Sequence, residues 1–326
     1  MEARAGRLSG GLRASGAYLL TGSLAGVNAA IPGYPIFAAQ ALRYTLATIV
    51  LAAACWVQRR RHPLDGPKIR LTRRLVLLLG LQATVGVTGF NYCTAEAVRH
   101  TGAATVGTVI AAVPVVLAIA GPLAARGRPA PRVIAAALLV AAGAGVVTGL
   151  GGSNLPGLLL ALGALVAEVS FTLVAMPLLP VFGPLRASAW VSACSVPVLF
   201  ALAFATGGGD AVPAPSAGQA AAIAYLAVVV CAGGFYLLYS ALPRLGADRV
   251  GLFAGLVPFG AMGAELLLGA GTIGPADVAG AVLVAAGVAA GAVARAPGQE
   301  RTGQRKKKDT AAAPQQSRTR TGAPRA

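Results

Sequence analysis

The sequence predicts an all-α, polytopic membrane protein with ten transmembrane helices arranged as two inverted five-helix repeats. Three observations support this fold class: long apolar runs, basic residues confined to alternate connecting segments, and a stretch of the first half that recurs in the second. Of the 326 residues, 56% are hydrophobic and only 11% are charged, with a mean hydropathy of +0.72. A soluble domain usually carries about 25% charged residues, so the composition excludes an ordinary soluble fold.

The apolar residues come in runs long enough to cross a bilayer, which requires roughly 20 mostly apolar residues per helix. Several runs are rich in Ala and Gly, and Gly is frequent in membrane helices because it lets two backbones approach closely. The expected spans, in chain order, are residues 14–31, 35–57, 75–97, 103–124, 131–150, 156–178, 186–206, 219–242, 249–270 and 276–294.

Domain boundaries follow the composition between these runs. A cytoplasmic N-terminus of residues 1–13 precedes a first five-helix repeat at residues 14–150. A turn-rich connector, residues 151–155, leads to the second, inverted repeat at residues 156–294. Residues 295–326 are polar and basic, with too few apolar side chains to form a core, so we expect a disordered cytoplasmic tail.

Basic residues are placed as the loops of a membrane protein require. If the N-terminus lies in the cytoplasm, every Lys and Arg except Arg43 and Arg99 falls on the inner side. Because Lys and Arg accumulate in cytoplasmic loops, the net charge of +17 indicates membrane orientation and not nucleic-acid binding. We expect both termini in the cytoplasm of a multi-pass protein of the inner (plasma) membrane, with anionic lipids against the basic loops and tail.

The second half of the chain repeats part of the first. Residues 92–143 align without a gap on residues 236–287, an offset of 144 residues. The informative matches are those of Tyr, Gly and Pro, because Ala, Leu and Val coincide easily in this composition; they are Tyr92/Tyr236, Gly102/Gly246, Gly107/Gly251, Pro114/Pro258, Gly127/Gly271, Pro131/Pro275 and Gly143/Gly287. An odd number of helices per repeat makes the second copy enter the membrane from the opposite face. Inverted repeats are typical of secondary transporters, whose site lies at the repeat interface near the bilayer midplane.

Several segments carry a resemblance to a known family. The stretches AVRHTGAATVGTVIAAVPVVLAIAGPL and ALPRLGADRVGLFAGLVPFGAMGAELLLG resemble the fourth helix of the EamA-type module, and FAAQALRYTLA resembles its second helix, with Arg43. PRVIAAALLVAAGAGVVTG and PADVAGAVLVAAGVAAG resemble the Gly-rich fifth helix. The resemblance, over about residues 14–294, implies the drug/metabolite transporter superfamily, whose EamA-type members export amino acids and other metabolites. One departure is that Arg126 and Ala270 stand where the family often has an acidic residue.

Three ionisable residues lie deep within expected spans, where a charge costs roughly 2.5–3.5 kcal/mol on insertion scales. Arg43 shares a helix face with Gln40 and Tyr44, a polar stripe suited to binding a carboxylate or to a structural ion pair. Glu168, one turn from Thr172, is a candidate to carry a proton or to meet a substrate ammonium group. The alternative is that Glu168 is permanently paired with Arg43.

The third deep residue, Glu265, is expected to line an outer vestibule or to make packing hydrogen bonds. Pro114 and Pro258 are expected mid-helix, either as hinges facing the central cavity or as static bends. Glu96 and Arg99, three residues apart, are expected to form a surface pair. Further polar or aromatic lining is expected from Asn28, Gln82, Asn91, Tyr92, Phe235, Tyr236 and Tyr239.

These observations together predict a secondary active transporter that exports amino acids, other small metabolites or drugs by alternating access, with the proton as a candidate coupling ion. No P-loop pattern is present in the sequence, so an ion or solute gradient is the expected energy source. A membrane-embedded enzyme and a non-transporting scaffold or channel are the alternatives. The two His residues lie outside the spans and the four Cys show no metal-ligand spacing, so we expect no catalytic residue, cofactor or metal. Self-association is left open.

Overall fold

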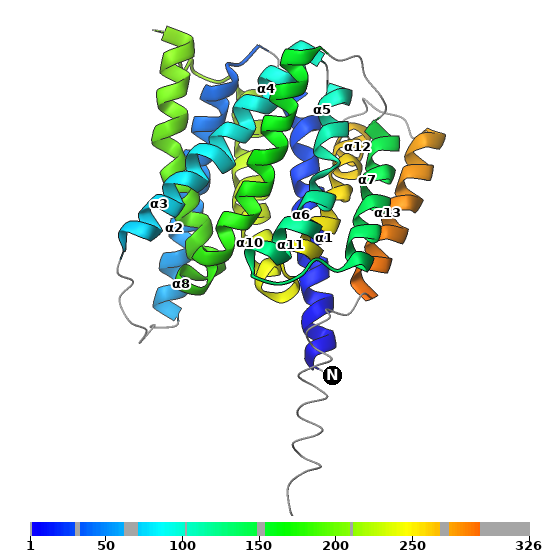
Figure 1. Cartoon of the computed structure of the whole chain (residues 1–326). Coiled ribbons are helices and arrows are strands. Elements are labelled where there is room, and N and C mark those ends of the chain that lie inside the picture. Colours follow the sequence, from blue (N-terminus) through cyan, green and yellow to red (C-terminus); the bar gives the residue numbers. More distant parts are fainter. Residues whose placement is uncertain are drawn as a thin grey trace, which may run out of the picture. The chain divides into compact units, whose positions relative to one another are not determined.

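The computed structural model describes residues 2–29, 33–61, 71–101, 103–148, 154–208, 211–267 and 274–293. The expected tail at residues 295–326 and most of the connector at residues 151–155 lie outside these ranges. The described residues are helical almost throughout and include no strand, which confirms the all-α fold class (Figure 1).

The helices of the first half begin at the chain's second residue, so the predicted N-terminal segment continues directly into the first helix. They are α1 Glu2–Ala29, α2 Ile36–Arg61, α3 Arg73–Leu81, the π-helix η1 Gln82–Gly89, α4 Phe90–Thr101, α5 Ala103–Ile110, α6 Val113–Ala124 and α7 Pro131–Thr148. Those of the second half are α8 Leu155–Gly207, α9 Ala217–Tyr225, the π-helix η3 Leu226–Gly233, α10 Gly234–Leu245, α11 Ala247–Leu252, the 3-10 turn η4 Phe253–Leu256, α12 Val257–Leu267 and α13 Pro275–Val293.

The long helix α8 is two helical segments joined at a bend. Gly183 sits at φ 70° and ψ 167°, a left-handed conformation that interrupts the helix and that glycine adopts without steric cost. Pro184 follows and starts the second segment, as proline does in a first helical turn. The bend therefore separates two of the expected spans.

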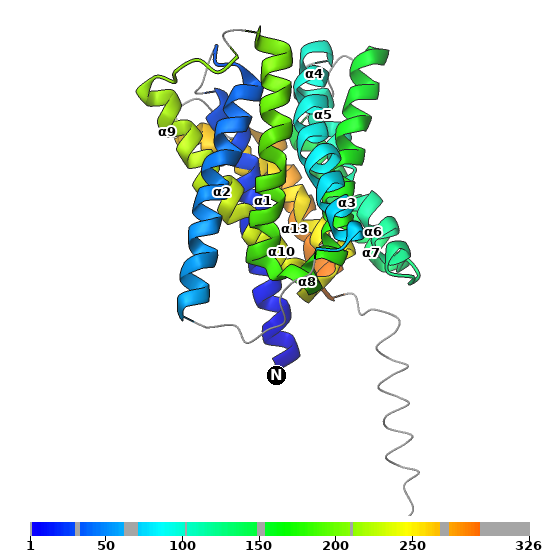
Figure 2. The same ribbon diagram turned by 90° about the vertical axis from the view of Figure 1, so that its left-hand side faces the viewer.

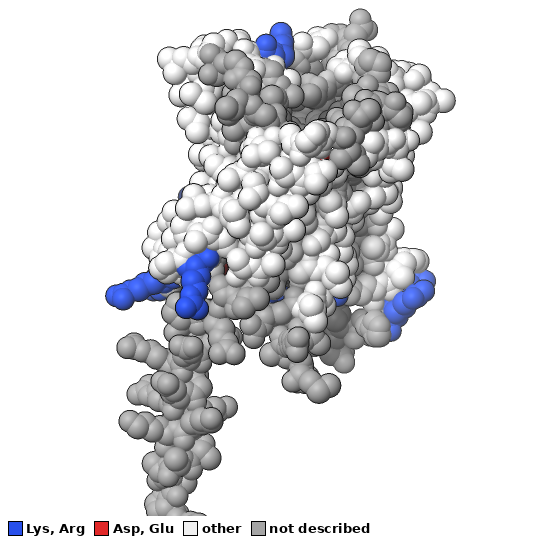
Figure 3. Space-filling view, turned by 90° about the vertical axis from the view of Figure 1, so that its right-hand side faces the viewer, with Lys and Arg blue, Asp and Glu red and all other residues white. Residues whose placement is uncertain are grey.

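Four described helical stretches are long and apolar enough to cross a membrane: Ile36–Arg61, Arg73–Thr101, Leu155–Gly207 and Ala217–Leu245. Shorter apolar helices cover Val113–Ala124, Pro131–Val146 and Pro275–Gly291. The face shown in Figure 3 is mostly uncharged along its length, and basic side chains gather toward the end from which α1 begins. This arrangement supports a polytopic membrane protein, while the number of ten spans stays a prediction.

The internal repeat extends further in the structure than in the sequence. The boundaries of α3, η1 and α4 recur, shifted by 144 residues, as those of α9, η3 and α10. Both π-helices thus occupy equivalent places, although few of their residues match. The first residues of α5, α6 and α7 likewise correspond to those of α11, α12 and α13.

Helix contacts cross between the halves. Helix α2 packs along α8, as Figure 2 shows, while α1 packs against α10 and α12. The α1–α12 crossing is so close that a Cβ on Gly22 would collide with the carbonyl oxygen of Val257, and one on Gly260 with that of Leu19. Small residues permit this backbone approach, which is a main source of helix association in lipid.

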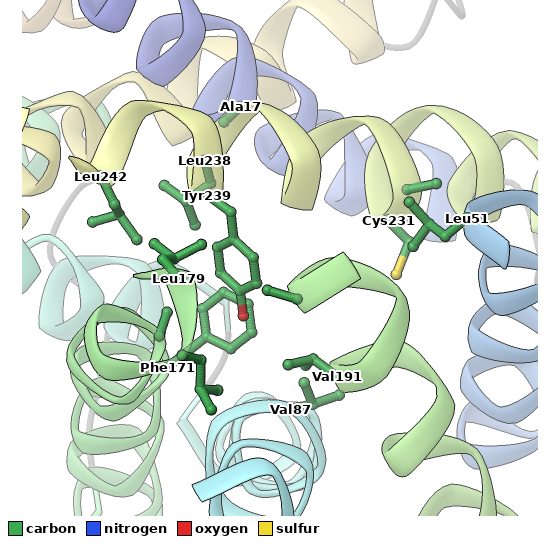
Figure 4. Packing of buried hydrophobic residues seen from close by; sticks show 14 of the residues in the cluster. Ala17, Leu51, Val87, Phe171, Leu179, Val191, Cys231, Leu238, Tyr239 and Leu242 are labelled. Atoms are coloured by element: carbon green, nitrogen blue, oxygen red, sulfur yellow. The ribbon is translucent and has the colours of Figure 1, made fainter. Parts of the chain in front are cut away.

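The largest buried cluster lies where α1, α2, α8 and α10 meet. In it Phe171 stacks on Tyr239 with ring centroids 5.7 Å apart (Figure 4). The ring centroid of Phe235, which packs against this cluster, lies 5.0 Å from that of Phe171. Gln82 of η1 is fully buried beside them and donates from Nε2 to the Phe171 carbonyl at 2.7 Å and to the Tyr239 hydroxyl at 2.8 Å. One side chain of the first half thereby ties together two helices of the second.

At each expected proline kink the helical hydrogen-bond pattern changes, although turn-type hydrogen bonds continue across it. The fourth expected span ends its first helix at Ile110 and resumes at Val113, with Pro114 in the first turn of α6. In the second half, the 3-10 turn η4 separates α11 from α12, and Pro258 is the second residue of α12. Each proline therefore lies in the first turn of the helical segment that follows, where proline is favoured because no intrahelical N–H donor is required.

Candidate solute-binding cavity

A cavity opens between the two halves, next to the aromatic cluster. About 650 Å³ of empty space, including its mouth, lies between walls contributed by α1, α2, η1, α4, α8, η3 and α10. The lining residues are Ala17, Tyr18, Thr21, Leu24, Arg43, Tyr44, Gly86, Val87, Phe90, Asn91, Glu168, Phe171, Val230, Cys231, Gly234, Phe235 and Leu238. This cavity is referred to as the central cavity.

The two repeats contribute equivalent positions to this wall. Gly86, Val87, Phe90 and Asn91 correspond, at the offset of 144 residues, to Val230, Cys231, Gly234 and Phe235, and all eight line the central cavity. Each set spans the end of a π-helix and the start of the α-helix that follows. π-Helical segments often occur at functional sites, and here they form the two facing walls of the cavity.

Arg43 and Glu168 bring opposite charges into the cavity. Arg43 is 5% exposed, and its Nε and Nη1 have no hydrogen-bond partner in the described part of the chain. Its guanidinium carbon lies 4.9 Å from the centre of the Tyr44 ring, a cation–π distance. Among the described residues that line the cavity, Arg43 is the one cation and Glu168 the one carboxylate.

The alternative prediction, a permanent ion pair between these two residues, has no counterpart among the described residues. Within the described residues the ion pair is Arg99 with Glu96, at 3.1 Å between Nη1 and Oε1, which confirms the predicted surface pair. Arg43 and Glu168 therefore face a shared space without neutralising each other directly. A buried polar group without a partner is rare and requires an explanation.

Polar groups of α1 complete the site. Tyr18 is 2% exposed and lines the cavity together with Glu168. Thr21 donates to the carbonyl of Ala17 at 2.9 Å, and Asn91 donates from Nδ2 to that of Val87 at 2.8 Å. The cavity thus offers hydrogen-bond donors from Tyr18 and Arg43 together with one carboxylate.

The other predicted site residues lie elsewhere. Gln40 and Thr172 are buried, at 4% and 0% exposure, but neither lines the central cavity. Pro114 and Pro258 are not among the lining residues either, and their role as hinges or as static bends stays a prediction. Asn28 and Glu265 belong to α1 and α12, and their side chains fall outside the described part of the structure.

The wider set of predicted lining residues divides in three. Asn91 and Phe235 line the cavity, Gln82 and Tyr239 are fully buried beside it, and the side chains of Tyr92 and Tyr236 are 42% and 41% exposed. Sequence reasoning missed Tyr18, Thr21 and Phe171. The repeat offset is the one signal that could have found more, because it relates the lining positions of η1 and α4 to those of η3 and α10.

A helical bundle whose two repeats surround a charged cavity defines the class of membrane transporters. The chain belongs to the EamA-like transporter family, which two segments match, residues 15–149 and 155–290. It is similar to "Uncharacterized transporter YetK" of Bacillus subtilis (strain 168), with 26% identity over 237 residues, 70% of this chain and 69% of the relative. A solved structure titled "Crystal structure of protein" shares the fold with a TM-score of 0.73 at 20% identity, over 87% of this chain and 97% of that one.

Proposed function

We propose that this membrane transporter is a secondary active exporter of amino acids or other small carboxylate-bearing metabolites, working by alternating access across the inner or plasma membrane. The observation that carries the proposal is the pair of unpartnered N–H groups of Arg43 in the same cavity as Glu168. Each unpartnered guanidinium N–H can donate a charge-assisted hydrogen bond to a carboxylate. Glu168 then receives either the ammonium group of a zwitterionic solute or a proton.

Alternating access follows from the two related halves. The equivalent wall positions from η1 with α4 and from η3 with α10 support a mechanism in which each half adopts the conformation of the other. Such an exchange opens the cavity first to one side and then to the other. Because the sequence has no nucleotide-binding motif, a gradient of protons or of solute supplies the energy.

An amphipathic drug-like solute is a second candidate, supported by the aromatic part of the wall. Tyr44, Phe171 and Phe235 line the cavity, with the Tyr44 and Phe235 rings 6.0 Å apart. Aromatic faces bind apolar and cationic groups. Competition of hydrophobic amines against labelled amino acids would separate the two solute classes.

Efflux from proteoliposomes of full-length protein tests the carboxylate role of Arg43. Each charge-assisted hydrogen bond contributes about 1.5–3 kcal/mol, so Arg43→Gln should lower kcat/KM by at least about tenfold. Arg99→Gln removes a 76% exposed arginine and serves as the matched control. Wild-type kcat/KM in Arg43→Gln would refute the assignment, and the absence of flux of any solute in the wild type would favour a scaffold.

Glu168→Gln tests the coupling role in the same vesicles. If Glu168 carries the coupled proton, the variant should lose the dependence of efflux on the pH gradient while still exchanging solute. If it binds the ammonium group, zwitterions should be transported poorly while simple carboxylates persist. Unchanged transport and unchanged pH dependence would discard both roles.

The proposed orientation places both termini in the cytoplasm, supported by the confinement of basic residues to one side. Reporter fusions at the two ends of the chain test it. Both should report the cytoplasm; ends on opposite faces would contradict the inverted arrangement of the repeats.

A further inference from the structure

A second hollow lies at the end of the bundle where the charged ends of α2 and α10 meet the bend of α8. It encloses about 690 Å³ of empty space, including its mouth. Its lining residues are Arg13 of α1, Gln58 of α2, Phe182, Gly183, Pro184, Leu185 and Arg186 of α8, and Tyr236, Ser240 and Arg244 of α10. We call it the arginine pocket; it is separate from the central cavity, with which it shares no lining residue.

Three guanidinium groups from three different helices converge on this pocket. Arg13, Arg186 and Arg244 come from α1, α8 and α10, and none of the described residues lining the pocket is acidic. Arg244 donates from Nη1 to the carbonyl of Ser240, which draws its side chain back along α10. Arg186 lies three residues after Gly183 at the bend of α8 and is partly buried.

A polar side chain with unused hydrogen-bonding capacity lies in the same wall. Ser240 is 1% exposed, and its hydroxyl has no partner within the described part of the chain. A buried hydroxyl without a partner is costly, whereas one that donates to a bound anion is satisfied. The exposed tyrosine of the pocket, Tyr236, supplies a further hydroxyl at the mouth.

We propose that the arginine pocket binds a phosphate group, either the headgroup of an anionic phospholipid or a soluble phosphate. Three cations without a lining carboxylate select an anion, and the planar fork of arginine matches phosphate oxygens bidentately. Basic pockets between membrane helices are known sites for anionic headgroups. The lining residue Gln58 directly precedes the basic last turn of α2, and basic ends of membrane helices attract anionic headgroups. This inference is independent of the proposed solute and of Arg43.

Binding to purified full-length protein tests the proposal in two arms. In the first, native mass spectrometry measures retention of phosphatidylglycerol against phosphatidylcholine. In the second, thermal unfolding is followed with inorganic phosphate against sodium chloride at equal ionic strength. The variants are Arg186→Gln and Arg13→Gln, from different helices, so that one remains informative if the other does not fold. Arg74→Gln, an exposed arginine of α3 outside the pocket, is the matched control.

Wild-type protein should prefer the phosphate-bearing probe over its neutral or chloride counterpart in at least one arm. Each pocket arginine contributes about fivefold in affinity near a membrane surface, so either pocket variant should lose about that factor while Arg74→Gln loses none. Preference in the lipid arm alone identifies a headgroup, and preference in the phosphate arm identifies a soluble anion. No preference in either arm, or an equal loss in Arg74→Gln, would overturn the proposal.

Discussion

The buried amide of Gln82 should stabilise the fold through two measurable hydrogen bonds. Hydrogen bonds between membrane helices average about 0.6 kcal/mol and reach about 1.7. Gln82→Leu removes the bonds to the Phe171 carbonyl and the Tyr239 hydroxyl, which predicts a loss of about 1–3 kcal/mol. The substitution also removes the Gln82 Oε1, a buried oxygen without a hydrogen-bond partner in the described structure. Removing that oxygen offsets part of the lost stability. The net expectation is about 1–2 kcal/mol.

Unfolding in mixed micelles with increasing dodecyl sulfate measures this loss. Tyr239→Phe breaks one of the two bonds and should cost about 0.6 kcal/mol. The double variant with Gln82→Leu should show a coupling of similar size. Tyr236→Phe, at a side chain 41% exposed and one turn away, is the control and should stay within about 0.5 kcal/mol of wild type. A Gln82→Leu protein as stable as wild type, or strictly additive losses, would refute the reasoning.

Three further predictions concern the packing, breaks and caps of the helices. Gly22→Ala should cost about 1–3 kcal/mol by overpacking against α12, whereas Gly263→Ala, which meets nothing within 4 Å, should be neutral or stabilising in the same assay. Pro114→Ala and Pro258→Ala should change stability by less than about 1 kcal/mol, yet slow efflux if the two proline regions act as hinges. Wild-type efflux rates would instead identify both regions as static bends. Asn154→Ala removes the cap that accepts from the Gly157 N–H at 2.9 Å and should lower the melting temperature through a loss of about 1 kcal/mol.

The repeat illustrates how far sequence comparison reaches. Gly and Pro matches revealed it from residue 92 onward, because those residues answer to backbone geometry. Upstream of residue 92, η1 and η3 occupy equivalent positions, but their residues differ. At the repeat offset Gln82 aligns with Leu226, and Thr84 aligns with Val228. A π-helix depends on how the backbone hydrogen bonds are arranged, which no residue type in these segments specifies.

The candidate site was predictable only in its charged members. Arg43 and Glu168 stood out because ionisable groups are few within apolar spans. Phe171 and Tyr18 did not, since an aromatic residue in a helix is equally suited to packing. Gln40 lies one turn from Arg43 and is about equally buried, but it is not among the lining residues of the cavity.

The sequence by itself determined that the chain is an all-helical membrane protein, where its apolar helices lie and on which side its basic residues gather, because these follow from solvation along the chain. Only the tertiary structure decided that Arg43 and Glu168 face one cavity without pairing, and that Arg13, Arg186 and Arg244 meet in another. The physical reason is that such meetings depend on how each helix is rotated and how closely it packs. Contacts between residues far apart in the chain set that packing, and the local pattern of apolar and polar residues does not predict those contacts.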